Sequence, residues 1–457
     1  MSTIVIQKFG GTSVQDAEAM RRAIAIVKKH GVKRGIRPMV VLSACAGVTN
    51  ALIRIGELSL LGKIDEAHKA ITDLDHRHFG ILHDLHLSLR SEQEVSLSLR
   101  FIWREIRTLV RGIELLDELT PKMKDKLLSA GERASTAIFS YALRESLADK
   151  GIQIHLFDAR EFFLTDSEFT AARPQVNEIT KQMKLIGKRL ASGAVGVTQG
   201  FIGATKRGET TTIGRGGSDF SATIMGIALG AKEIQIWTDV AGIYTCDPRI
   251  VPKAYAQPMM SFDDASTMAF FGAKVLHPET IGPAIEAGIP VRVLSSKEPN
   301  KKGTTIINKP VDNIIISGIS IKRNIILAKA SSNGIVPQTY TLPVIFDALE
   351  SKKIIPFASS VSFDDILLAL EASDNYSELH EEIDTVADLT FLHKRSLITL
   401  VGQGLDTHSG ISARLFGALE NTNCEMISYG GAKNAISIVV PEEEVERAVK
   451  NIHAEFF

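Results

Sequence analysis

Short apolar runs alternate with amphipathic helical patterns over the first 300 residues. Stretches rich in β-branched residues occupy 4–7, 39–43, 152–157, 194–199, 233–237 and 291–293, and helical periodicity marks 17–29, 182–191 and 218–229. Buried strands that alternate with helices are typical of a mostly parallel sheet covered by helices. The pattern therefore predicts an α/β fold that opens with a βαβ unit.

Residues 50–118 depart from this alternation. Leu, Ile and Phe recur there three or four residues apart between charged residues, and the stretch contains no proline. This spacing places the apolar side chains on one face of each helical turn. We therefore expect a long helical excursion between two strands of the sheet.

The character of the chain changes near residue 300. Residues 296–305 are polar and rich in turn formers, which predicts a domain boundary near 300–312. Beyond it, Phe-Asp-Ala-Leu-Glu at 346–350 recurs as Phe-Gly-Ala-Leu-Glu 70 residues later, and the same offset places 366–370 on 436–440. Two copies of a small β-α-β unit follow from this repeat. Copies this short bury little surface alone, so we expect them to pack side by side or with a second chain.

Composition narrows the classes of function. The chain has 457 residues, with 52 Lys and Arg against 53 Asp and Glu, so its net charge of −1 offers no case for binding nucleic acid or an anionic membrane. Its three cysteines are far apart, which argues against a disulfide framework and a zinc site. No signal-peptide pattern or membrane-spanning run is evident. We expect a cytoplasmic protein with a small-molecule site.

Four histidines at positions 76, 78, 83 and 86 raise the question of a metal site. On a helix, His83 and His86 share a face, whereas His76 and His78 point to different sides. Two imidazoles fall short of the three or four ligands that zinc requires. We therefore expect no protein-bound metal there.

The most informative segment is 212–222, Thr-Ile-Gly-Arg-Gly-Gly-Ser-Asp-Phe-Ser-Ala. Three glycines surround Arg215, and a helix is predicted to begin at Ser218 or Asp219. Backbone N–H groups of such a loop, ahead of a helix N-terminus, favour phosphate or carboxylate. An ordinary tight turn with a surface arginine is the alternative.

Other candidate residues follow strands or a glycine. Lys8 and the glycines at 10 and 11 end the first strand, where ligands bind in open α/β sheets, although a surface lysine before a turn is the alternative. Residues 43–50 supply small and hydroxylic side chains for a polar substrate, or helix caps. Glu132 follows a glycine and suits a substrate ammonium group, or is a solvated charge.

Residues 237–249 follow another strand. Asp239 and Tyr244 suit a nucleotide's sugar and base, and Arg249 its phosphates. Lys274 adds a further cation. Together with Lys8 and the glycine loops, these residues form the set that phosphoryl transfer needs, in which positioning and charge neutralisation contribute most and Mg²⁺ bridges the phosphates.

With these segments in this order, the sequence resembles the aspartate kinases of the amino acid kinase family. The resemblance covers about 1–305 and rests on 8–14, 43–50, 131–132, 199–203, 210–222, 237–249 and 271–278. It implies an α/β catalytic domain with a mostly parallel sheet between helices at 1–305, divided into an aspartate-binding lobe (1–205) and an ATP-binding lobe (206–305). The repeats resemble paired ACT regulatory domains of ferredoxin-like βαββαβ fold, at 313–385 and 393–457.

The resemblance also implies residue roles for making 4-phospho-L-aspartate from L-aspartate with ATP and Mg²⁺. Lys8 and Asp219 are the implied catalytic residues. The implied aspartate-binding residues are Ser43, Thr49, Glu132, Phe201, Arg215 and Ser218. The implied ATP-binding residues are Lys8, Phe9, Gly10, Gly11, Thr238, Asp239, Tyr244, Arg249, Lys274 and Val275. A kinase acting on another acidic amino acid and a non-catalytic amino-acid sensor are the competing hypotheses.

The regulatory half departs from the pattern of lysine-sensitive relatives. Tyr340 and Thr341 stand where the second copy has Gly410 and Ile411, and Pro356 holds a position that we expect in a strand. Lysine, threonine or no amino acid therefore remain open as the effector at the ACT domains. The repeats also favour a homodimer or homotetramer.

Overall fold

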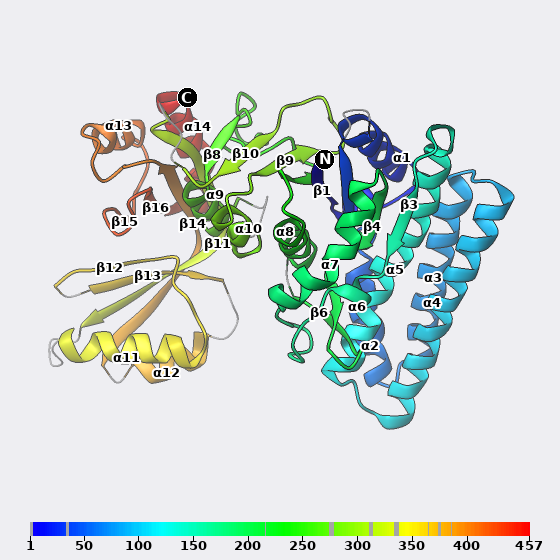
Figure 1. The fold of residues 1–457 in the computed structure, drawn as a ribbon. Coiled ribbons are helices and arrows are strands. Elements are labelled where there is room, and N and C mark those ends of the chain that lie inside the picture. The colour runs from blue at the N-terminus through cyan, green and yellow to red at the C-terminus, as the bar shows by residue number, and fades with distance from the viewer. Residues whose placement is uncertain are drawn as a thin grey trace. The chain divides into compact units, whose positions relative to one another are not determined.

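The computed structural model describes residues 3–32, 36–214, 216–273, 278–309, 314–332, 338–363, 365–372, 376–384 and 386–457. The chain divides into two compact units (Figure 1). One unit comprises 1–242 with 276–308, and the other comprises 243–275 with 309–457. The change of unit at 308–309 lies within the boundary expected from the sequence, whereas 243–275 groups with the second unit. The finer division into lobes and ACT domains stays a prediction.

A mostly parallel sheet forms the centre of the first unit. Its strands run in the order β3-β4-β2-β1-β7-β9-β10, and all of these neighbours are parallel except β9 and β10. Their bounds are Ile4–Phe9 (β1), Arg37–Leu42 (β2), Ile154–Phe157 (β3), Val195–Gln199 (β4), Ile234–Thr238 (β7), Val291–Ser295 (β9) and Thr304–Ile307 (β10). The six strands predicted from apolar runs are confirmed.

Helices cover both faces of this sheet. On one face lie α1 (Ala17–Ile26), which continues as a π-helical turn to Gly31, and α5 (Pro121–Ser146). On the other lie α7 (Val176–Ala191), α8 (Gly217–Leu229) and α10 (Pro278–Glu286). Shorter elements are η1 (Gly11–Ser13), η4 (Ala148–Lys150), α6 (Ala159–Phe162), β5 (Ile202–Ala204) and β6 (Thr210–Thr212). The last two pair as an antiparallel hairpin.

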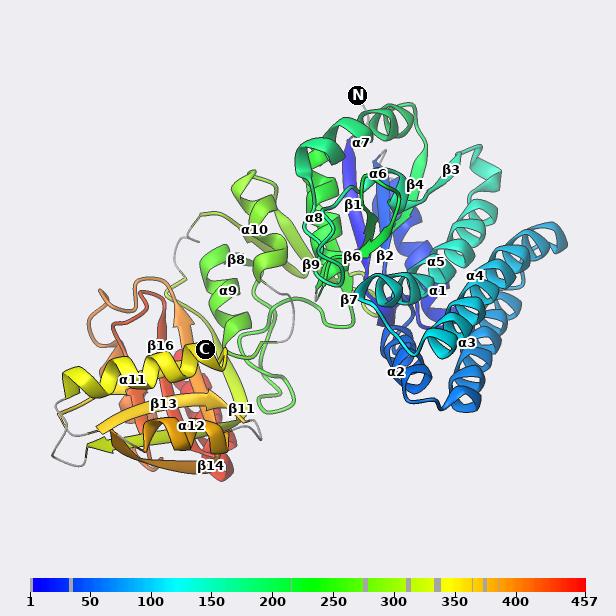
Figure 2. The same ribbon diagram turned by 90° about the horizontal axis from the view of Figure 1, so that it is seen from below.

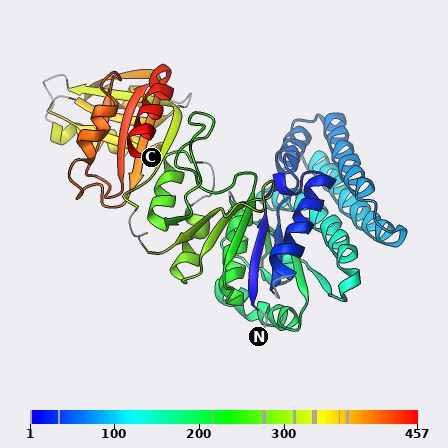
Figure 3. The same ribbon diagram turned by 90° about the horizontal axis from the view of Figure 1, so that it is seen from above.

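The helical excursion predicted for 50–118 is confirmed as α2 (Val48–Leu60), α3 (Ile64–Asp84) and α4 (Leu89–Leu116), which pack with α5 (Figures 2 and 3). The sequence did not reveal α5, because residues 127–140 are buried almost without interruption and therefore lack an amphipathic period.

The histidines at 76–86 lie on or just after α3. His78 is fully buried beside Trp103, with ring centroids 5.2 Å apart, and its Nδ1 lies 2.7 Å from the Leu74 carbonyl oxygen. Burial lowers the pKa of His78 to about 4. His83 and His86 have ring centroids 6.2 Å apart. No cluster of three or more metal-binding side chains occurs in the described part of the chain.

An antiparallel sheet with the order β12-β13-β11-β14-β16-β15 forms the second unit. Its strands are Ile316–Ser332 (β11), Ala358–Val361 (β12), Asp365–Glu371 (β13), Ala387–Gly402 (β14), Met426–Ser428 (β15) and Ala435–Pro441 (β16). The helices are α11 (Gln338–Ser351), α12 (Tyr376–Ile383), α13 (Ile411–Ala418) and α14 (Val445–Phe456), with a 3-10 turn η5 at Glu442–Glu444. The unit also contains β8 (Met259–Ser261) and α9 (Phe262–Phe270). Among the helices described in either unit, none combines the length and apolar character needed to cross a bilayer.

The internal repeat is confirmed, and its two copies share strands. The first copy runs β11-α11-β12-β13-α12-β14. The second copy uses the later half of β14 and then α13-β15-β16-α14. The early half of β11 pairs with the later half of β14 and takes the place of the last strand of the second copy. Asn324 and Lys394, which are 70 residues apart, both have a positive φ (56° and 57°) where the long strands pass from one copy to the other. The strands of the two copies therefore form one continuous sheet.

The residues that set the first copy apart lie near its helix α11. Tyr340 lies in the first turn of α11 and is 69% exposed, whereas Gly410, 70 residues later, is the N-cap of α13 with φ +86°. Pro356 lies before β12 rather than inside a strand, which corrects the expectation for that position.

Candidate active site

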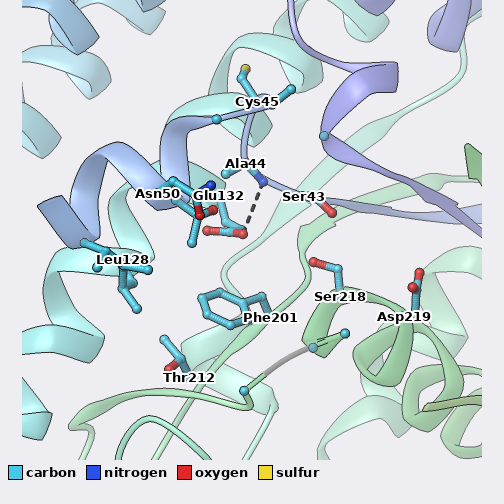
Figure 4. Close-up of a pocket in the computed structure, with 18 of the residues that line it drawn as sticks. Ser43, Ala44, Cys45, Asn50, Leu128, Glu132, Phe201, Thr212, Ser218 and Asp219 are labelled. Carbon is cyan, nitrogen blue, oxygen red and sulfur yellow. Dashed lines mark hydrogen bonds between the residues drawn. The ribbon is translucent and has the colours of Figure 1, made fainter. Parts of the chain in front are cut away.

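A cavity of about 700 Å³ opens in the first unit where β1 and β2 end (Figure 4). Ligands bind at the carboxyl ends of the strands in open α/β sheets. The residues that line it are Lys8, Gly11, Ser43, Ala44, Cys45, Ala46, Gly47, Thr49, Asn50, Ile53, Lys124, Leu128, Glu132, Thr170, Phe201, Thr212, Gly214, Gly216, Gly217, Ser218 and Asp219. Segments from across the first unit therefore converge on one site.

Lys8 and Asp219 form an ion pair in this cavity. Lys8 Nζ lies 2.6 Å from Asp219 Oδ1, and the two side chains are 10% and 16% exposed. Lys8 comes from the end of β1 and Asp219 from the first turn of α8. With so little water to screen the charges, this pair produces a strong local field. Asp219 therefore fixes the position of the Lys8 ammonium, which is the group of this pair that can meet an anion.

The glycines after Lys8 let the backbone approach closely. A Cβ atom at Gly11 would lie 2.8 Å from the Ala44 carbonyl oxygen, a distance that real side chains do not adopt. At Gly10, a Cβ atom would lie 3.7 Å from Lys8 Nζ. Glycine at position 11 therefore allows the turn after β1 to pack against the segment that follows β2.

Glu132 is a buried carboxylate with an open oxygen. It projects from α5, is 3% exposed, and accepts a 3.2 Å hydrogen bond from the Ala44 N–H (Figure 4). Its Oε2 has no hydrogen-bond partner among the described residues. Burial raises the pKa of Glu132 to about 8, against the opposing effects of the Ala44 N–H and the Lys8 charge. The solvated-charge alternative is therefore wrong, and the site is complementary to a cation.

The glycine loop, which is the part of the 212–222 segment that precedes α8, is built differently from the sequence prediction. The helix α8 begins at Gly217, and its N-cap is Gly216, with φ +72° and no side-chain cap. The expectation of a Ser or Asp start was wrong, because left-handed glycine ends the loop one residue earlier. Ser218 and Asp219 consequently lie in the first turn of α8 and face the cavity. Arg215 lies outside the described residues.

Phe201, Ser43 and Thr49 also line the cavity. Phe201 has φ +66°, and its ring packs so closely over α8 that a Cβ atom at Gly217 would lie 2.7 Å from Phe201 Cδ2. The helix α2 begins at Val48 after Gly47, so Thr49 does not cap it. The cavity wall therefore includes an aromatic ring and several hydroxyl groups.

Sequence reasoning missed several lining residues. Lys124 and Leu128 precede Glu132 by eight and four positions on α5, and this helical spacing places all three on the cavity side. Recognising α5 would have revealed them. Thr170 also lines the cavity and carries no local sequence signal of that role, whereas Thr212, which lines it too, is the first residue of the 212–222 segment although no role was predicted for its side chain.

The residues expected to bind ATP are spread over both units. The Phe9 side chain is fully buried, and the centroids of its ring and the Trp237 ring are 6.1 Å apart. Contact between Phe9 and a nucleotide would therefore come from its backbone. Thr238 ends β7, and the exposed Asp239 follows it. Tyr244 and Arg249 belong to the second unit. There the Arg249 side chain, 88% exposed, pairs with Asp247 at 2.6 Å. Lys274 and Val275 lie outside the described residues.

Comparison with known proteins is consistent with this site. Residues 3–295 match the model of the amino acid kinase family, and residues 398–456 match an ACT domain. The chain is 35% identical to lysine-sensitive aspartokinase 3 of Escherichia coli over 100% of both chains. It is 33% identical to chloroplastic aspartokinase 2 of Arabidopsis thaliana over 99% of this chain and 84% of the relative.

Two solved structures of E. coli aspartokinase III are 34% identical to this chain. The complex with lysine and aspartate (T-state) has a TM-score of 0.84 and covers 99% of each chain. The complex with aspartate and ADP (R-state) has a TM-score of 0.81 and covers 99% of this chain and 100% of the other. This chain belongs to the amino acid kinase family and, within it, to the aspartokinases.

Proposed function

We infer that this aspartokinase transfers the γ-phosphoryl group of ATP to the β-carboxylate of L-aspartate. The product is 4-phospho-L-aspartate, and the reaction is the first step of the aspartate pathway to lysine, threonine and methionine. One observation carries this conclusion: a shielded Lys8–Asp219 pair shares one cavity with Glu132, a buried carboxylate that has an open oxygen. The site can thus hold an ammonium group and a transferring anion together.

Each side chain has a proposed role in this reaction. Glu132 binds the substrate ammonium through its open oxygen, and Lys8 neutralises negative charge on the phosphoryl group during its transfer. Asp219 holds the Lys8 ammonium in place. No general base is required, because the β-carboxylate of aspartate is already ionised at neutral pH.

The remaining site residues have proposed binding roles. Arg215 clamps the α-carboxylate with its planar guanidinium, and Ser43, Thr49, Phe201 and Ser218 complete the aspartate site. Phe9, Gly10 and Gly11, with Thr238, Asp239, Tyr244, Arg249, Lys274 and Val275, make up the proposed ATP site.

ATP as phosphoryl donor agrees with the ADP named in the complex of the E. coli relative. We propose that Mg²⁺ accompanies it. Mg²⁺ binds through one or two carboxylates together with substrate phosphates, and Asp219 is the carboxylate beside Lys8 in the cavity. When bound, the ion reduces the negative charge on the phosphates.

The proposed reaction is tested by measuring ADP release with L-aspartate, L-glutamate or N-acetylglutamate as the only acceptor. We expect turnover with aspartate alone. We also propose that an amino acid acts as an effector at the ACT domains, because the E. coli relative is named lysine-sensitive and its structure was solved with lysine. Adding lysine, threonine or methionine singly to the same assay identifies that effector. Turnover with another acceptor but not aspartate would contradict the assignment, and no turnover with any acceptor would favour a non-catalytic sensor.

We also propose that the second unit pairs between chains, giving a homodimer or homotetramer. Phe346 on α11 and Phe416 on α13 occupy equivalent repeat positions, and they are 42% and 39% exposed. Large apolar side chains exposed at matching places suit a symmetric contact. Light scattering should give at least twice the chain mass of 49.8 kDa, and a stable monomer at micromolar concentration would refute the proposal.

A further inference from the structure

Asp125 lies behind the cavity wall and belongs to none of the motifs above. It projects from the second turn of α5, and its side chain is completely buried. Its carboxylate accepts hydrogen bonds from Thr170 N (3.1 Å to Oδ1 and 2.9 Å to Oδ2), Thr212 N (2.9 Å to Oδ2) and Thr212 Oγ1 (2.6 Å to Oδ1). One buried carboxylate therefore ties two separate segments to α5.

Both segments form part of the cavity wall. Thr170 and Thr212 line the cavity, whereas Asp125 does not. Two residues after Thr212, Gly214 also lines it with φ +75°, and a Cβ atom there would lie 3.6 Å from the Thr170 carbonyl oxygen. The segments that Asp125 holds thus meet each other at the start of the glycine loop.

The backbone conformation of Thr170 indicates that contacts with the rest of the protein hold this segment in place. Its φ is +74°, which is unusual for a β-branched residue because the side chain crowds the backbone in the left-handed region. Such a conformation persists only when surrounding contacts hold it. The Thr170 N–H donates to both oxygens of Asp125, and the nearby Ala172 N–H donates to the Thr212 carbonyl oxygen at 2.9 Å, so the Asp125 contacts are a main part of what restrains it.

We propose that Asp125 is a positioning residue for aspartate binding, which holds the Thr170 and Thr212 segments in the conformation that shapes the substrate cavity. This inference rests on the proposed function. Asp125 acts through these two segments and does not touch the cavity itself.

The expected signature is a rise in the KM for aspartate without a matching loss of kcat. When a binding-competent conformation is only partly populated, the apparent affinity falls by that fraction, so a drop to about one tenth raises the apparent Kd about tenfold. Saturating aspartate selects the competent conformation again. Lys8 and Asp219, which lie on β1 and α8, do not bond to Asp125, so kcat at saturation stays close to that of the wild type.

The test compares Asp125→Asn with Asp166→Asn. Asp166 lies in the same loop as Thr170 and also accepts backbone N–H groups, from Glu168 (3.2 Å) and Arg173 (2.9 Å), but it does not line the cavity. Asp125→Asn should raise the KM for aspartate about tenfold or more and leave kcat and the KM for ATP within about threefold. Asp166→Asn should change the KM for aspartate less than about twofold.

A second variant keeps the test decisive if Asp125→Asn fails to fold. Thr212→Val preserves shape and the backbone N–H and removes only the Oγ1 donor, so a smaller rise in the KM for aspartate, about threefold, is expected. An unchanged KM for aspartate in both variants would overturn the inference, as would a fall in kcat together with a similar rise in the KM values for both aspartate and ATP. Wild-type protein that does not phosphorylate aspartate would instead overturn the proposed function.

Discussion

Glu132→Gln should raise the KM for aspartate about 100- to 1000-fold while making the ligand-free protein more stable. The open oxygen of Glu132 is buried, so a substrate ammonium that loses the carboxylate is left without its countercharge. In the absence of substrate the same ionisable group lowers the free energy of unfolding, because its pKa rises from 4.5 to about 8 on folding. Gln removes that cost, which amounts to about 3 kcal/mol at pH 7.

The pH dependence provides the sharper measurement. Because the folded pKa lies above the unfolded one, the stabilising effect of neutral Glu132 is full below pH 4.5 and is lost as pH rises towards about 8. Thermal unfolding of the ligand-free wild type should show this loss, and Glu132→Gln should not. Aspartate binding should improve over the upper part of the same window, since the ammonium requires the ionised carboxylate.

Glu105→Gln is the matched control. Burial raises the pKa of Glu105, but hydrogen bonding and charge from Arg133, 2.7 Å away, outweigh it and hold the pKa below its usual value. Gln at this position leaves the buried Arg133 without its carboxylate and should therefore destabilise the protein. Wild-type aspartate affinity in Glu132→Gln, or a lower unfolding temperature, would show that the role assigned to Glu132 is wrong.

Lys8→Met should lower kcat about 100- to 1000-fold, as expected when a preorganised group that stabilises transition-state charge is removed. Its Nζ is held 2.6 Å from Asp219 Oδ1 and is largely shielded from water. Aspartate binding, measured by calorimetry, should persist. Its pH profile should move to higher pH, because the Lys8 charge helps to lower the pKa of Glu132.

Lys69→Met is the control for loss of a lysine–aspartate pair. Lys69 pairs with Asp73 at 2.9 Å on α3, where the side chains are 77% and 63% exposed, and exposed pairs contribute little. This variant should retain wild-type kcat. If Lys8→Met remained fully active, or if both variants lost activity alike, the catalytic assignment of Lys8 would fail.

Local pattern was sufficient for much of the fold. The strands around Lys8, Trp237 and Val291 were predictable because short apolar, β-branched runs bounded by turn formers are typical of buried strands. The helices α2 to α4 were predictable from their amphipathic spacing. By contrast, α5 is buried on nearly all sides, and its uniform burial removed the signal that reveals a helix.

The sequence by itself identified the chemical groups that matter: Lys8 with its glycines at the end of the first strand, Glu132 after a glycine, and the loop that leads to Asp219. It also revealed the repeat in the second unit. Only the tertiary structure decided that Lys8 meets Asp219, that Glu132 keeps an open oxygen, and that Asp125 binds Thr170 and Thr212. The reason is physical. Strand and helix formation depend on neighbours in the chain, whereas contacts, burial and shifted pKa values depend on groups that packing brings together from distant positions.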